Sequence, residues 1–192
     1  MKKLLLLLCV LVCSACSTTP PDRQDFLLTA QRAGTNQSVR FGALQVNELR
    51  SSAPFRDLAL IYRESPQRYI ADPYHGFLAT PSSQITQNTR RWLSQSGLFS
   101  QVYPSGSSLI APWQLEGELL AVYIDVSEPN SPKAVIQAQF LLSHQQQSRS
   151  FELSAAQALP DATPETAAQG LSVALESLLK QLEQHLTSSN FD

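Results

Sequence analysis

Alternation of apolar and polar residues along the middle of the chain predicts a series of β-strands. Residues 39–49 alternate in this way, with Gly42 placed for a bulge, and residues 58–63 form a dense apolar run with 67–71 as its hairpin partner. Gln137 and Gln139 fall on the polar side of one alternation, which indicates a sheet face that is wet or meets a partner. Further strands are predicted at residues 25–29, 99–103, 115–126, 134–144 and 151–159.

Two segments have the spacing of amphipathic helices instead. The first is capped by Ser82 or Ser83, carries Trp92 on its apolar face as a core residue, and ends at Gly97, where a left-handed residue is favoured. The second begins after Thr163 as N-cap, with Pro164 in its first turn. Its apolar stripe consists of Leu171, Leu175, Leu178 and Leu182.

The leucine spacing of 4, 3 and 4 residues would also suit a coiled coil. Barely two heptads are present where three or four are expected, so a core helix is favoured. Strands and helices together predict an α+β fold in which the leucine stripe packs onto the sheet.

The first twenty residues have the pattern of an export signal. Lys2 and Lys3 precede an apolar run at 4–12 that is too short to stay in a bilayer as a spanning helix, and small residues then lead to Cys16. The stretch 13–16 resembles the bacterial lipobox, with Cys13 where Leu is commonest. We expect residues 1–15 to be removed and Cys16 to carry a lipid. An ordinary cleaved signal and an N-terminal anchor helix are the alternatives.

Cleavage would leave about 177 residues, the size of one ordinary domain. Residues 16–24 are rich in Ser, Thr and Pro and are predicted to form a lipidated tether with a contour length of at most about 30 Å. Residues 25–187 are predicted to form a single domain and 188–192 a flexible tail. Cys9 and Cys13 would leave with the signal, so we expect no disulfide.

Charge argues against nucleic acid as a partner. Removing Lys2 and Lys3 from the 14 basic residues leaves 12 against 16 acidic residues, a net charge of −4. Residues 40–91 hold seven Arg and four acids, whereas 92–192 hold three basic residues and ten acids. Solvated faces explain this division most simply. Opposite patches that meet head to tail between copies are the alternative.

The chain offers little catalytic chemistry. His75, His144 and His185 lie far apart without metal-ligand spacing, and we expect neither a metal nor a cofactor. Glu116 and Glu118 share one face of a predicted strand, where exposed alternating acids are a commoner explanation than a hydrolytic pair. We therefore expect a protein that is not an enzyme.

Several segments resemble one known family, the ABC-type transport auxiliary lipoproteins, of which the PqiC-like proteins are a branch. The resemblance spans the mature chain nearly end to end and is carried by an anchor cysteine, Arg68-Tyr69, a C-terminal helix, and the segments DFLL at 25–28, LIYR at 60–63, SGLFSQV at 96–102 and LEGEL at 115–119. The family usually has a Trp with a Pro three residues on. This chain has Phe77 with Pro81 instead.

The resemblance implies a two-layer sandwich in which an antiparallel or mixed β-sheet is covered by two α-helices. It also implies a lipoprotein on the periplasmic face of the outer membrane, since Ser17 after Cys16 looks like an outer-membrane sorting signal. It implies a non-catalytic docking module whose partner is an MCE-domain protein or ABC transporter complex that moves lipids across the envelope, with a homo-oligomer as one form of assembly. Arg63, Arg68 and Phe77 are the candidate interface residues. The alternative for them is solvated arginines and a core phenylalanine. A periplasm-facing lipoprotein that binds a lipid or small ligand is the alternative function, and a cell-wall hydrolase or its activator is a third class.

Overall fold

The computed structural model describes residues 22–188. Its centre is an antiparallel ribbon of three long strands, β7 (Trp113–Asp125), β8 (Lys133–His144) and β9 (Gln147–Ala158), which pair in the order β7-β8-β9. These strands form because apolar residues alternate with polar ones along most of their length, so one face can be buried. The predicted strands at 115–126, 134–144 and 151–159 are confirmed to within a few residues.

The second edge of β7 is occupied in turn by three shorter strands, all parallel to β7. They are β2 (Leu44–Val46), β3 (Arg50–Ser51) and β4 (Ala59–Ser65), and a short 3-10 helix, η1 (Ala53–Phe55), separates the last two. Strand β2 also pairs with β6 (Val102–Pro104), and β4 pairs with β5 (Arg68–Phe77), which pairs with β1 (Gln24–Phe26). The resulting nine-stranded sheet is mixed, as predicted.

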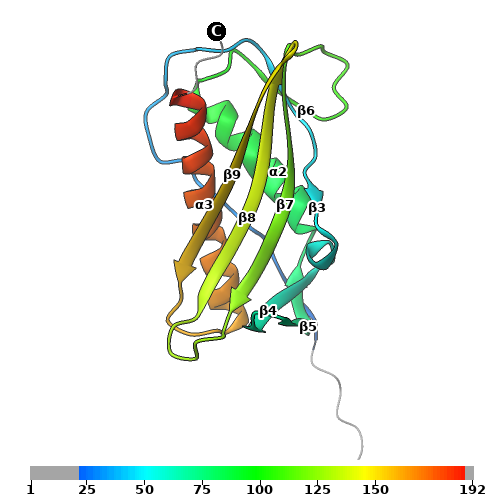
Figure 1. Ribbon diagram of the computed structural model, residues 1–192, viewed down its shortest axis with the longest axis vertical. Coiled ribbons are helices and arrows are strands. Elements are labelled where there is room, and N and C mark those ends of the chain that lie inside the picture. Colours follow the sequence, from blue (N-terminus) through cyan, green and yellow to red (C-terminus); the bar gives the residue numbers. More distant parts are fainter. Residues whose placement is uncertain (1–21, 189–192) are drawn as a thin grey trace, which may run out of the picture.

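The sheet is strongly curled. Figure 1 shows the three long strands bending along their length, while β4 and β5 cross the lower end at a steep angle. The α+β class is confirmed, but a flat two-layer sandwich is not what forms. The register shift in β7 between Leu119 and Ala121 and the irregular pairing of β4 with β5 are bulges of the kind that bend and twist a sheet.

Two helices, α2 (Pro81–Ser96) and α3 (Pro164–Ser188), cover the inner face of the sheet (Figure 1). The leucines at 171, 175, 178 and 182 are all fully buried, so the core-helix interpretation is confirmed. Each buried leucine stabilises the fold by about 1.5–3 kcal/mol relative to an exposed one. Ala134 and Ala138 of β8 are fully buried, and their small side chains leave room for α3.

Two predicted boundaries are wrong for local reasons. Helix α2 is preceded by Thr80 as N-cap and has Pro81 in its first turn, so neither Ser82 nor Ser83 caps it. The predicted strand at 39–49 shrinks to β2 and an isolated bridge between Phe41 and Phe99, because the chain before it bonds to the end of α2 instead. The predicted ending of α2 at Gly97 is confirmed by its φ of 78°.

Candidate functional site

The segment after β1 lies in the groove between α2 and α3 and is held there through its backbone. The N–H groups of Leu28 and Ala30 donate to Gln84 and Asn88 of α2, at 2.6 and 2.9 Å. The N–H groups of the residues that follow each of these, Thr29 and Gln31, donate to Ser172 and Glu176 of α3, at 3.2 and 2.9 Å. Successive backbone amides of this segment thus donate alternately to α2 and α3, which fixes the segment between the two helices.

The segment leads directly into a buried ion pair. The Arg32 guanidinium donates from Nε and Nη2 to the two oxygens of Glu183 on α3, at 2.9 and 2.8 Å. Trp92 Nε1 and Gln37 Nε2 donate to the same carboxylate at 2.7 and 3.0 Å. Arg32 also donates to the backbone carbonyls of residues 34, 35 and 95, so all five of its N–H groups have acceptors.

The protonation states of this pair follow from its contacts. Burial alone would raise the pKa of Glu183, but hydrogen bonds from Arg32, Trp92 and Gln37 outweigh it and hold that pKa below its usual value. The hydrogen bond to Glu183 in turn raises the pKa of Arg32. Both groups are therefore charged at neutral pH, and neither has a proton to give or take in acid–base catalysis.

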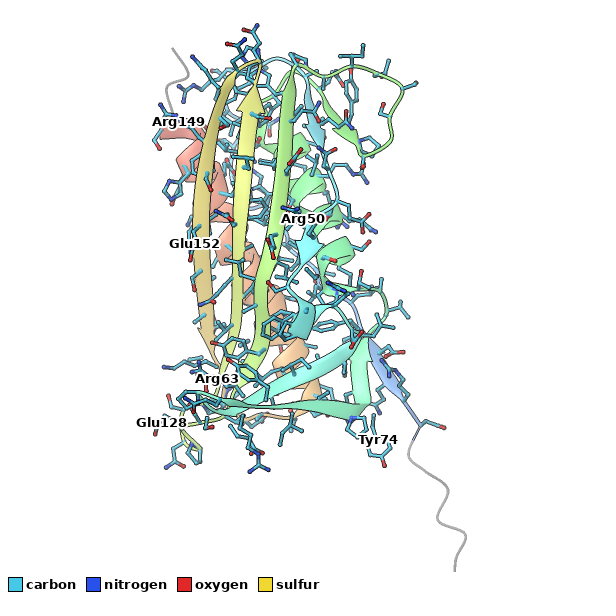
Figure 2. All side chains as sticks on the ribbon, turned by 45° about the vertical axis from the view of Figure 1, so that its right-hand side comes forward. Arg50, Arg63, Tyr74, Glu128, Arg149 and Glu152 are labelled. Carbon is cyan, nitrogen blue, oxygen red and sulfur yellow. The ribbon has the colours of Figure 1, made fainter. Side chains whose placement is uncertain are left out.

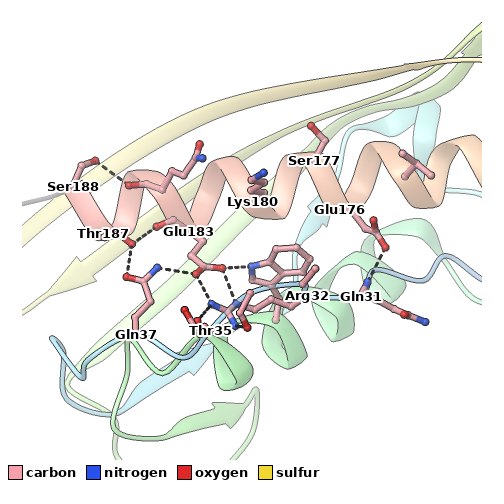
Figure 3. Close-up of a pocket in the computed structure, with 15 residues that line it drawn as sticks. Gln31, Arg32, Thr35, Gln37, Glu176, Ser177, Lys180, Glu183, Thr187 and Ser188 are labelled. Atoms are coloured by element: carbon pink, nitrogen blue, oxygen red, sulfur yellow. Dashed lines mark hydrogen bonds and ion pairs between the residues drawn. The ribbon is translucent and has the colours of Figure 1, made fainter.

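A pocket of about 740 Å³ opens beside this network, between residues 31–37 and α3 (Figure 3). Most of its lining residues are polar, among them Lys180, Glu176 and Gln184, although apolar atoms make up slightly more than half of the lining surface; Val173 is an exposed apolar residue of the wall. The volume lies in the range of small-molecule sites, but such sites are lined predominantly by apolar side chains. The apolar cavity that a lipid carrier needs is not what this pocket provides.

The outer edge of β9 is a second feature that can bind a partner. Strand β9 pairs with β8 along its whole length, and its other edge has no strand partner among residues 22–188. The β8–β9 hairpin closes at the His144–Gln147 pair across two residues, and in such hairpins alternate residues from 148 onward point their backbone groups away from the partner strand. The Ser154 carbonyl confirms this pattern, because Gln181 of α3 reaches it from outside at 3.2 Å.

Helix α3 and the strand itself cover two positions of this edge. Gln181 occupies the Ser154 carbonyl, and the side chain of Gln157 donates to the Ala158 carbonyl at 3.0 Å. The remaining outward-pointing residues of the edge are Ser148, Ser150, Glu152 and Ala156, all exposed. Three of these four side chains are small, so another backbone can approach closely.

The outer face of the sheet carries the two acids considered as a hydrolytic pair. Glu116 is exposed, and Glu118 accepts a hydrogen bond from Ser52 at 3.2 Å. Arg50 lines the same shallow hollow, and Figure 2 shows it on the side of the sheet next to β7. The arrangement is an exposed polar surface.

The three predicted interface residues are not brought together as one surface. Arg63 forms an ion pair with Asp125 and lies over the Tyr123 ring, 5.0 Å from its centroid, at the lower end of the molecule in Figure 2. Arg68 is 70% exposed and pairs with Glu64 at 3.0 Å. Phe77 is 1% exposed, so its proposed interface role is wrong and the core interpretation holds.

Metal and membrane features can be stated for residues 22–188. In that range no group of three His, Cys, Asp or Glu side chains is placed to hold a metal ion. Neither α2 nor α3 has an apolar stretch long enough to span a bilayer. Cys16, the signal peptide and most of the tether lie outside the described residues, while Gln24, predicted as the end of the tether, is already in β1.

Sequence reasoning missed the Arg32–Glu183 pair and the free edge of β9. The two charged residues are 151 positions apart, and nothing in the local sequence of either indicates its partner. The alternation at 151–159 predicted a strand, but alternation does not say which strand will be last in the sheet.

Comparison with protein-family models finds no match, and no curated protein matches. Among solved structures, protein XCC0632 from Xanthomonas campestris, described as DUF330, is similar with a TM-score of 0.66 and 16% identity, covering 86% of this chain and 93% of that one. A second, described as an uncharacterized protein, has a TM-score of 0.69 and 12% identity, covering 86% and 99%. A PelC dodecamer from Paraburkholderia phytofirmans has a TM-score of 0.47 and 14% identity, covering 82% and 96%, too low to bear on assembly.

These findings correct the family assignment made from the sequence. XCC0632 is described as DUF330, and no family model matches this chain, so the assignment to the PqiC-like ABC-type transport auxiliary lipoproteins is wrong. At 12–16% identity the two stronger likenesses establish the fold alone.

Proposed function

We propose that this chain is a non-catalytic docking module, anchored by a lipid on Cys16 to the periplasmic face of the outer membrane. The observation that carries the docking role is the free edge of β9, where the backbone groups of four exposed positions have no strand partner within residues 22–188. The occupant is an extended segment of a partner protein, which would add as a further strand. Backbone hydrogen bonds would supply the affinity of such a contact, and side chains its specificity.

The small side chains of the edge support this mode of binding. Natural sheets usually protect a long edge with Lys, Pro or a bulge, and none of these occurs between Gln147 and Ala158. The buried charges support a role without catalysis, because Arg32 and Glu183 are saturated by each other and by their neighbours.

The corrected family assignment removes the sequence argument for any particular partner. The docking role is therefore proposed on geometry and on the lipobox. The partner expected from the sequence, an MCE-domain protein or ABC transporter complex of a lipid-transport system, is one identity that the test can reveal. A second copy of the chain, paired through the same edge, is the other occupant that the test distinguishes.

The test is capture of the intact, membrane-derived protein in two matched proline variants. Ser150→Pro removes an N–H that points away from β8 and leaves the β8–β9 pairing in place. Ser108→Pro, in the exposed loop before β7, is the control. We expect the wild type and Ser108→Pro to retain a co-purifying protein and Ser150→Pro to lose it at unchanged stability. Equal capture by all three would contradict docking at the β9 edge.

A small-ligand site is the second candidate, favoured by the pocket of about 740 Å³ beside α3. Binding there would raise the unfolding temperature of the purified protein in the presence of ligand, and Lys180→Ala would abolish that rise. A rise that survives Lys180→Ala would place the ligand elsewhere.

A further inference from the structure

Three large exposed side chains lie on or directly after the paired strands β1 and β5, near the start of the described chain. Leu27 and Leu78 are 57% and 62% exposed, and Tyr74 is 42% exposed. Strands β1 and β5 run parallel there, with Phe26 opposite Phe77, and the Leu78 N–H donates to the Phe26 carbonyl at 2.9 Å. Leu27 and Leu78, the first residues after the two strands, are therefore neighbours.

Alternation at the paired ends of β1 and β5 places Leu27 and Leu78 on one face, and this face together with the neighbouring Tyr74 is called here the base face. Phe77 points inward with 1% exposure and Phe26 packs against the core, so the residues on either side of each point outward. The Arg23–Asp25 ion pair, at 2.8 Å, lies over Gly76 on the same side. The base face thus consists of Leu27, Leu78, Tyr74 and a paired charge.

Tyr74 is held in position by a tight turn. The N–H groups of Tyr74 and His75 donate to one oxygen of Asp72 at 2.8 and 3.0 Å, and His75 Nδ1 contacts the other at 2.9 Å. Figure 2 shows Tyr74 at the lower end of the molecule, directed away from the body and close to the strand from which the N-terminal chain departs. A tyrosine with an apolar ring and a polar tip suits the boundary between lipid and water.

We propose that the base face rests on the bilayer surface, with Leu27 and Leu78 inserted among the lipid headgroups. The inference depends on the proposed lipid at Cys16. Five residues lie between Cys16 and Asp22, the first described residue, and six Cα–Cα steps span at most about 20 Å, so this end of the domain lies close to the membrane. The charges of the face oppose contact little, because Arg23 and Asp25 neutralise each other. A partner strand would find only three residues of β1 to pair with.

The test places a fluorescent bimane on single cysteines in the full chain, matured in cells. Residues 22–188 contain no cysteine, so each introduced thiol can be labelled alone. Leu78→Cys probes the base face. Ile110→Cys, 94% exposed in the loop between β6 and β7, probes the opposite end of the molecule (Figure 1). Vesicles of phosphatidylethanolamine and phosphatidylglycerol, with and without doxyl-labelled lipid as quencher, provide the surface.

We expect doxyl lipid to remove most of the fluorescence at position 78 and little at position 110. Adding Leu27→Glu to the Leu78→Cys protein should restore the fluorescence while the protein still floats with the vesicles.

Flotation without quenching at position 78 would overturn the inference and leave the anchor intact. Equal quenching at both ends would also overturn it, because the domain would then lie flat. Failure to float would refute the lipid anchor itself, and the inference with it. If the label at position 78 is shielded from solvent in native membranes but not on the protein-free vesicles, a membrane protein covers the base face, and the inference is overturned.

Discussion

Replacing Glu183 with alanine tests whether the pair with Arg32 holds the N-terminal segment to the helices. The change removes four hydrogen bonds of 2.7 to 3.0 Å and leaves a guanidinium whose side chain is 5% exposed without its counter-ion. Removing one partner of a buried ion pair costs about 3–5 kcal/mol. Arg32 keeps three carbonyl acceptors and the adjacent pocket admits water, so we expect a loss near 3 kcal/mol.

Urea unfolding at pH 7 measures this loss, with an unchanged slope indicating an unchanged native state. Glu176→Ala is the matched control on the same helix, because that carboxylate accepts one exposed hydrogen bond and should cost about 1 kcal/mol or less. The folded-state pKa of Glu183 is lowered, so its contribution is present above the unfolded pKa of about 4.3 and is lost as pH falls through the folded value. The difference between wild type and Glu183→Ala should therefore shrink in acid. A loss below about 0.5 kcal/mol at pH 7 would refute the reasoning.

Three further changes have direct outcomes. Leu178→Ala should lower the free energy of unfolding by about 2–5 kcal/mol, since the side chain is fully buried, and a change below about 0.5 kcal/mol in urea unfolding would contradict that burial. Gly97→Ala should lower the free energy of unfolding by at least about 1–2 kcal/mol, because φ is 78° and a Cβ would lie 2.6 Å from the Gln37 carbonyl oxygen. An unchanged midpoint of urea unfolding would contradict the left-handed cap. Cys16→Ala should move the protein from the membrane to the soluble fraction without loss of stability, as fractionation and urea unfolding together would measure; an unlipidated mature N-terminus in the wild type would contradict the anchor.

The sequence predicted the parts of the fold that depend on local periodicity. The leucine stripe of α3 and the alternation of β7 and β8 predict their elements well, because the first repeats over several helical turns and the second over several successive residues of each strand. The region 39–49 was misjudged because its backbone bonds go to the end of α2, a tertiary contact that alternation cannot report. The candidate site depended still more on tertiary structure. Phe77 looked available in the sequence and is buried, and the edge of β9 is open because, within the described part of the chain, no strand pairs with its outer side.

The central claim, that the free edge of β9 docks a partner protein, is tested most directly by photocrosslinking in intact cells. A photoreactive amino acid at Glu152, on the exposed edge, is compared with one at Ser94 on the exposed side of α2. We predict that position 152 crosslinks to a second protein of the envelope, identified by mass spectrometry, and that position 94 does not. Recovery of position 152 only as an uncrosslinked monomer under every growth condition, or equal crosslinking from both positions, would contradict the docking function.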